Sequence, residues 1–147
     1  MTVAIAIAPC DAAVFNGKWN IIGALTTFSV KSFPGALPPS YAYVRAQGMP
    51  VGEAFEIAVP LASSRIADDG VDMEVLWSDR VEGQISSAPR GVSTQIVKFG
   101  LLVARVDAAG ASPVVVPSSG EYELQAFFND RLSGATILPV LRRKGER

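Results

Sequence analysis

The sequence of 147 residues contains no histidine. This absence excludes Ser-His and Cys-His nucleophile pairs, histidine-based metal sites and the commonest general base near neutral pH. The chain also has no glycine-rich run between a strand pattern and a helix pattern, so the common phosphate-binding fingerprints are missing. We therefore predict a protein that is not an enzyme, with no catalytic residue, no metal ligand and no cofactor site.

Cysteine occurs once, at position 10, so an intramolecular disulfide is excluded. A chain without disulfides fits a reducing compartment. Asp11 follows directly, and a neighbouring carboxylate raises the pKa of a thiol, whereas an activated thiol needs a positive neighbour. We expect Cys10 to pack as a small apolar side chain where the first strand ends, and Asp11 to accept hydrogen bonds from turn amides.

Charged residues are scarce and balanced. They make up 18% of the chain, 13 basic against 14 acidic, for a formal net charge of −1 at pH 7. No broad electrostatic field is available to attract phosphate backbones, which argues against nucleic-acid binding. The one charge run, "RRKGER" at residues 142–147, is expected to be a frayed basic tail after a single domain of residues 1–141.

Long hydrophobic runs are also absent. The apolar opening "MTVAIAIAP" is far shorter than the roughly 20 residues that cross a bilayer, and it has neither a basic leader nor a signal-peptidase site. We expect a cytoplasmic protein without a membrane partner. Apolar residues nevertheless make up 49% of the chain, and an interface with a second subunit or another protein is the plainest way to cover this excess.

The apolar residues alternate with a period of two, and no segment keeps the 3.6-residue period of a helix. Pro9 is expected to end the first strand, and Asn16-Gly17 to form a tight hairpin turn or a wider loop. Pro60 lacks a backbone donor, which favours an edge strand. Turn-rich segments lie between the strands, at residues 31–40, 78–91 and 108–120, where Val114–Val116 can add a few ladder bonds. The first expected strands are residues 3–8, 19–30 with a bulge or a close backbone approach at Gly23, 41–48, 53–63 and 71–77. Residues 92–107 are expected to be one long strand, or two joined by a bend at Gly100, and residues 120–128 and 131–143 a closing hairpin around Asn129-Asp130.

About eight strands at regular spacing predict an all-β fold, an antiparallel β-sandwich of immunoglobulin-like or related type, with a small barrel as the alternative. Gly120 and Tyr122 lie near the start of a late strand. This pair resembles the corner of immunoglobulin-like sandwiches, in which a tyrosine hydroxyl ties a crossing loop.

Six short motifs along the chain resemble an uncharacterised family of small bacterial proteins of unknown function. They are Cys10-Asp11, Gly17-Lys18, Ile22-Gly23, Phe33-Pro34, Asp69-Gly70, and Gly120 with Tyr122. The resemblance covers most of the chain and departs at residues 78–91 and in the apolar second half. It supports the sandwich and implies no activity.

Two sets of side chains are candidate ligand sites. Asp11, Asp68, Asp69, Asp72 and Asp79 can hold Ca²⁺ if they gather at one end of the sandwich, but their spacing fits no calcium loop, so turn chemistry is the preferred interpretation. Aromatic side chains can form a sugar-stacking platform if several share an exposed face, although core packing is the ordinary role. The aromatic residues concerned are Trp19, Tyr41, Tyr43, Trp77, Phe127 and Phe128.

The interpretation that best fits the sequence is a non-enzymatic structural or protein-interaction module, with itself or another protein as partner. It self-associates through an apolar sheet face or an edge strand. The strand within Glu53–Ala62 and the strand after Leu132 are the candidate open edges. The alternative is a sandwich that binds a carbohydrate or a carboxylate-bound cation at one end, near Asp11, Asp69 and Asp72.

Overall fold

The computed structural model describes residues 3–25, 27–67, 70–84, 97–105 and 114–143, and within them it contains strands and no helix. The predicted all-β class is therefore confirmed. In the described part of the chain, no helix is long and apolar enough to cross a membrane. The strands are β1 (Ala4–Phe15), β2 (Trp19–Ala24), β3 (Phe28–Val30), β4 (Gly35–Ala36), β5 (Tyr41–Met49), β6 (Ala54–Ala67), β7 (Gly70–Gln84), β8 (Val97–Arg105), β9 (Val115–Val116), β10 (Gly120–Phe128) and β11 (Arg131–Arg142).

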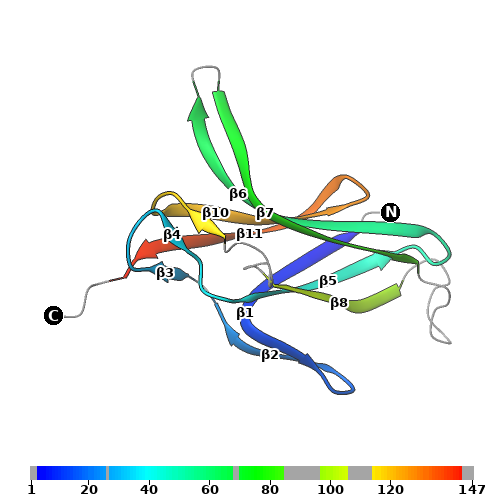
Figure 1. Ribbon diagram of the computed structural model, residues 1–147. Helices are drawn as coiled ribbons and strands as arrows, with labels where there is room; N and C mark the ends of the chain where they lie inside the picture. Colours follow the sequence, from blue (N-terminus) through cyan, green and yellow to red (C-terminus); the bar gives the residue numbers. More distant parts are fainter. Residues whose placement is uncertain (1–2, 26, 68–69, 85–96, 106–113, 144–147) are drawn as a thin grey trace.

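The strands form two main sheets and one small one. The four-stranded sheet has the order β2-β1-β5-β8, the five-stranded sheet the order β3-β11-β10-β6-β7, and β4 pairs with β9. Neighbouring strands are antiparallel, except that β3 runs parallel to the end of β11. The four-stranded sheet is curled, and the β1–β2 hairpin extends away from the five-stranded sheet, whose β6–β7 hairpin projects on the other side (Figure 1).

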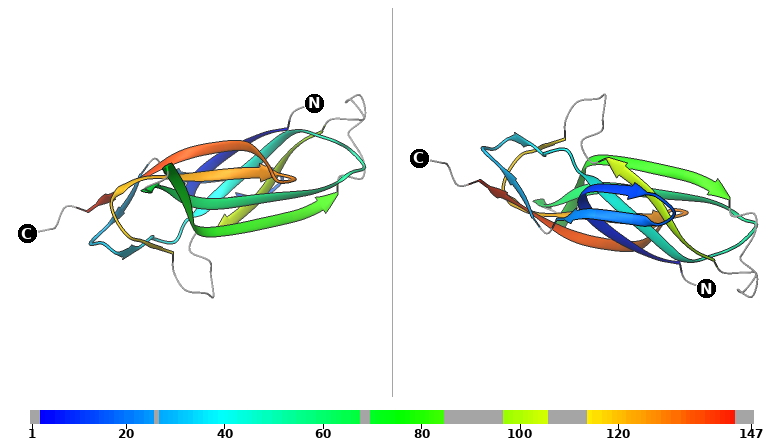
Figure 2. Two further views of the ribbon diagram at one scale, coloured as in Figure 1. Left: turned by 90° about the horizontal axis from the view of Figure 1, so that it is seen from above. Right: turned by 90° about the horizontal axis from the view of Figure 1, so that it is seen from below.

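One buried cluster joins inward-facing side chains of both sheets. Ile5 of β1 and Val44 of β5 belong to the same cluster as Ile57 of β6, Leu124 of β10 and Leu138 of β11. β1 passes close to β11, because a Cβ atom added to Gly134 would collide with the backbone carbonyl of Ile5. Two further views of the sheets are given in Figure 2.

The prediction that Pro9 ends the first strand is wrong, because β1 continues to Phe15. β1 changes partners near this proline: it pairs with β5 over Ala4–Cys10 and with β2 over Cys10–Phe15. The Pro9 carbonyl accepts a hydrogen bond from the Leu25 amide at 2.8 Å. The missing N–H of Pro9 therefore falls just beyond the β1–β2 ladder, where its loss costs little.

The prediction that Pro60 marks an edge strand is also wrong, because β6 lies between β10 and β7. The β6–β10 pairing includes Leu61 and Ala58 but neither of the two residues between them, so the proline coincides with a gap in the ladder.

The strand after Leu132 is not an open edge either. β11 has β10 on one side, and on the other it has β3 at Val140–Arg142 and the Ile5 carbonyl against Gly134.

β7 is longer than the sequence suggests, since it continues through Ser78–Gln84, which we expected to be a loop. Its pairing with β6 shifts by one residue, because Leu61 pairs with Trp77 and Ala62 with Val75. The extra residue, Leu76, moves Val75 to the opposite face from Trp77. Asp68, Asp69 and residues 85–91 lie outside the described residues.

The predicted hairpin turns are confirmed. Gly17 has a φ angle of +86° between β1 and β2, and Asn129 and Asp130 have φ angles of +47° and +67° between β10 and β11. Val115–Val116 adds a short ladder with β4, as expected. The tyrosine corner is present too, because the Tyr122 hydroxyl donates a hydrogen bond to the Ser118 carbonyl at 2.6 Å.

Candidate functional site: the β1–β2 hairpin

In the β1–β2 hairpin (residues 12–24), each of the two strands pairs only with the other among the described residues. β5 pairs with β1 no further than Cys10, so the remainder of β1 pairs with β2 alone. β2 is itself an end strand of that sheet. A strand in this position carries a row of backbone N–H and C=O groups that can pair with another strand.

The hairpin carries a concentration of exposed apolar side chains. Four of the ten large apolar side chains exposed in the described part of the chain belong to it. Register places Val14 and Ile22 on one face of the hairpin and Phe15 and Ile21 on the other. Lys18, in the turn, is the single charged residue between Ala12 and Val30. The usual charged residues that prevent edge pairing are therefore missing from β2.

The turn of the hairpin is held by asparagine side chains. The Asn20 side-chain amide donates a hydrogen bond to Oδ1 of Asn16 at 2.6 Å and another to the Lys18 carbonyl at 3.2 Å. The Asn16 amide donates to the same carbonyl at 3.1 Å. These bonds fix the Asn16-Gly17 turn and with it the register of β2 against β1.

An aromatic row anchors the hairpin to the sheet. The rings of Phe15 and Trp19 lie 5.4 Å apart, and those of Trp19 and Tyr43 lie 5.6 Å apart, with interplanar angles of 53° and 56°. Such tilted ring pairs stabilise by about 0.5–1.5 kcal/mol beyond the area they bury. Because Tyr43 belongs to β5, the row holds the hairpin against the curled sheet.

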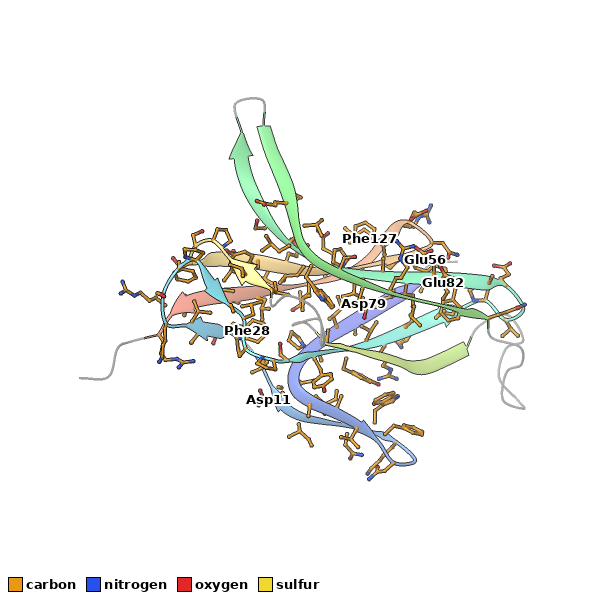
Figure 3. All side chains as sticks on the ribbon, in the orientation of Figure 1. Asp11, Phe28, Glu56, Asp79, Glu82 and Phe127 are labelled. Carbon is orange, nitrogen blue, oxygen red and sulfur yellow. The ribbon has the colours of Figure 1, made fainter. Side chains whose placement is uncertain are left out.

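Gly23 explains the local shape of β2. Its φ angle of +67° is one that favours glycine. A Cβ atom at this position would collide with the carboxyl group of Asp11, which lies over the glycine. We expected a bulge or a close backbone approach at Gly23, and the group that approaches it is the Asp11 side chain. Asp11 faces β2 at this point, on the lower side of the molecule in Figure 3.

Cys10 is fully buried. Burial raises the pKa of its thiol, and the Asp11 carboxylate adds to the increase, while backbone hydrogen bonds from Tyr43 and Ala12 oppose it. A buried thiol with a raised pKa is a poor nucleophile. The expected apolar packing of Cys10 agrees with this environment, but its expected place at a strand end does not, since it pairs with Ala24 and Tyr41 inside β1.

The two candidate carboxylates with described side chains, Asp11 and Asp79, lie on different sheets. Asp11 belongs to the four-stranded sheet, whereas Asp72 and Asp79 belong to β7 of the other sheet, and Asp68 and Asp69 lie outside the described residues. Among the residues that the structure describes, no three Cys, Asp or Glu side chains are grouped so that they could hold a metal ion.

The candidate aromatic residues are divided among several places, and Tyr41 lies at the start of β5, opposite Cys10. Trp19 and Tyr43 belong to the row described above, Trp77 is in the core, and Phe128 stacks on Phe55 with ring centroids 6.5 Å apart. Phe127 pairs with Ala58 on the outer face of the five-stranded sheet, where it is labelled in Figure 3. A single platform containing all of the predicted residues is therefore not formed.

Two surface depressions lie on the five-stranded sheet. The larger, of about 600 Å³, is lined by the paired Glu56 and Glu82 together with Phe55, Gln84 and Asn129. Arg80 approaches Glu56 at 3.7 Å there, and Asn129 is tied to the Glu56 backbone by two hydrogen bonds of 2.9 Å. These contacts give the polar side chains in the depression a structural role, so a bound ligand is not needed to account for them. The smaller depression, of about 390 Å³, lies beside Ser118 and Tyr122 at the tyrosine corner.

The hairpin edge was not among the candidate edges chosen from the sequence. The sequence contains one indication of this edge, because Lys18 is the single charged residue between Ala12 and Val30. No protein-family model matches the chain, and neither a curated protein nor a solved structure matches it. The resemblance to an uncharacterised bacterial family accordingly stays a prediction.

Proposed function

We propose that this protein is a non-enzymatic module that associates with copies of itself through the β1–β2 hairpin. The observation that carries the proposal is the combination of exposed Val14, Phe15, Ile21 and Ile22 with an end strand that has no charged side chain. Burial of such side chains gives about 25 cal/mol for each Å² removed from water, and the edge adds backbone hydrogen bonds.

We also infer that the two main sheets form a sandwich of immunoglobulin-like or related type, with a small barrel as the alternative. The core cluster shared by both sheets and the Tyr122–Ser118 hydrogen bond support the sandwich. The curl of the four-stranded sheet favours the barrel.

The outer face of the five-stranded sheet is a weaker candidate for the interface. Ile137 is exposed there, but it pairs with Glu123, and Pro139, two residues further along β11, pairs with Glu121. Two carboxylates thus interrupt the apolar surface, and their desolvation would oppose burial. The hairpin carries no such interruption.

The test is light scattering coupled to size exclusion over a tenfold concentration range, with matched lysine variants. Ile22 is 55% exposed and Ile137 59% exposed, so Ile22→Lys and Ile137→Lys place the same charge at equally accessible isoleucines. We expect the parent protein and Ile137→Lys to form the same oligomer, and Ile22→Lys to elute as a monomer. A monomeric parent protein, or dissociation by Ile137→Lys alone, would contradict the proposal.

The aromatic row favours one second candidate, a carbohydrate-binding sandwich. Phe15 is exposed, and Trp19 and Tyr43 are half-buried, so their rings are accessible to a sugar. Against it, the ring planes are tilted by more than 50° and do not offer one flat surface. A thermal shift on addition of glycans, abolished by Trp19→Ala, would support this candidate. The same assay with calcium tests the cation alternative.

A further inference from the structure

The direction of the backbone groups along β2 follows from its hairpin. In an antiparallel ladder, pairs that exchange hydrogen bonds alternate with pairs that do not. Asn16 and Lys18 are hydrogen-bonded through their backbones, so the Phe15–Trp19 pair is not, the Val14–Asn20 pair is, and the Ala13–Ile21 pair is not. The N–H and C=O groups of Trp19 and Ile21 therefore point away from β1, toward the open side of the sheet.

We propose that β2 pairs antiparallel with β2 of a second copy about a two-fold axis at Ile21, which joins two four-stranded sheets into one of eight strands. This inference rests on the proposed function and assigns its geometry. Outward-pointing residues face outward-pointing residues across the new ladder, and the axis places Ile21 against Ile21 of the second copy. Asn20 then opposes Ile22. The alternation along β2 does not continue past Gly23, whose φ angle is +67°, because the Leu25 amide donates to the Pro9 carbonyl of β1.

The charges at the two ends of β2 favour this antiparallel arrangement. Lys18 lies at the start of the strand, and the carboxyl group of Asp11 lies over Gly23 near its end. An antiparallel pair brings the lysine end of each copy beside the aspartate end of the other. A parallel pair would bring two lysines together and two aspartates together, which is unfavourable.

The side chains near the axis also suit a second copy of the same strand. Ile21 is 41% exposed, and the two-fold places it against its own equivalent, a β-branched pair of the kind that stabilises neighbouring strands. The interface is isologous, so one apolar strand supplies both surfaces.

β7, the longer of the two end strands of the five-stranded sheet, is less suited to pairing. Asp79 pairs with the buried Val59 and so occupies the core-facing side of the strand, and Arg80 and Glu82 add charges to its other face. Leu76 introduces a bulge. Inward-pointing charges and bulges are features that prevent edge-to-edge association.

Single cysteines introduced into β2 test the proposed register. Opposed residues of a hydrogen-bonded pair have Cα atoms about 5.5 Å apart, within the range that a disulfide bridges. Diagonal residues lie about 7–8 Å apart, beyond that range. Under mild oxidation we expect Ile21→Cys to form a disulfide-linked dimer and the matched Ile22→Cys to remain unlinked. The parent protein, with its buried Cys10, measures the background.

The outcomes separate this inference from the proposed function. Cross-linking of Ile22→Cys, alone or as well as Ile21→Cys, would overturn the register. An oligomeric parent protein in which neither variant is cross-linked would overturn the register about Ile21 and leave self-association standing, and the hydrogen exchange of Trp19 and Ile21 then decides whether β2 is paired. A monomeric parent protein would remove both proposals.

Hydrogen exchange gives a second measurement that needs no cysteine. The amides of Trp19 and Ile21 point away from β1, so they are protected only if another strand covers them. We expect their exchange in the oligomer to be at least about 100-fold slower than in Ile22→Lys. Equal rates in the two proteins would overturn the β2 pairing.

Discussion

At the scale of single residues, the Tyr122 hydroxyl makes the contact with the clearest energetic consequence. It donates to the Ser118 carbonyl at 2.6 Å from a side chain that is otherwise buried. Tyr122→Phe leaves that carbonyl without its partner, and we expect the free energy of unfolding to fall by about 1–2 kcal/mol. Urea denaturation measures the change.

Tyr43→Phe is the matched control for this prediction. Tyr43 is also a strand tyrosine, and in the described part of the chain no hydrogen bond of its hydroxyl is present. We expect its loss to change stability by less than about 0.5 kcal/mol. Equal effects of the two substitutions would show that the corner hydrogen bond contributes no stability of its own.

At the scale of strands, Asp79 is the residue that distinguishes β7 from β2. It faces the core side of an end strand, opposite Val59, and remains exposed. Asp79→Val removes this charge and adds a residue with high β propensity. We expect the free energy of unfolding to stay the same or rise by up to about 1 kcal/mol, while the protein aggregates at lower concentration.

The matched control for Asp79 is Glu82→Val, on the same strand but paired with Glu56 on the outer face. It removes an equal charge without changing the core-facing side of the edge. Turbidity and sedimentation at increasing protein concentration compare the variants. If Asp79→Val is as soluble as Glu82→Val, the aspartate does not protect the edge.

The strands also indicate what a sequence can predict here and what it cannot. The Asn16-Gly17 and Asn129-Asp130 turns and the tyrosine corner were predictable because each depends on residues close together in the chain. The predictions made from the two prolines were wrong because the effect of a proline on a strand depends on which distant strands pair with it. Pro9 lies where β1 changes from one neighbour to another, and Pro60 lies at a gap in the ladder with β10.

The candidate interface was only partly predictable for the same reason. The absence of charge around β2 is visible in the sequence, since Lys18 is the one charged residue between Ala12 and Val30. β2 is an end strand because, among the described residues, it pairs with β1 alone, and this depends on how strands distant in the sequence are arranged. Exposure of Ile21 and Ile22 follows from this pairing, and a period-two pattern cannot separate an inner strand from an end strand.

At the scale of the whole molecule, two-fold pairing through β2 uses that edge once in each copy. A closed, isologous interface of this kind stops at a dimer, whereas a head-to-tail contact would continue to grow. Of the other end strands with described side chains, β7 carries Asp79, Arg80 and Glu82, which oppose further addition of strands, and β3 has only three residues. We therefore expect light scattering to reach a plateau at twice the monomer mass.

Association of folded copies also links stability to concentration. Because unfolding releases two chains, each tenfold rise in protein concentration stabilises the dimer by about 1.4 kcal/mol, or about 0.7 kcal/mol per chain. For a chain of this length, that corresponds to an increase in Tm of about 2 °C per tenfold rise. Scanning calorimetry on the parent protein checks this slope, and Ile22→Lys supplies the comparison, since its Tm should not change with concentration. The same slope in both proteins would mean that the stabilising contact lies outside the hairpin, and a flat parent curve would mean that the folded chain is a monomer.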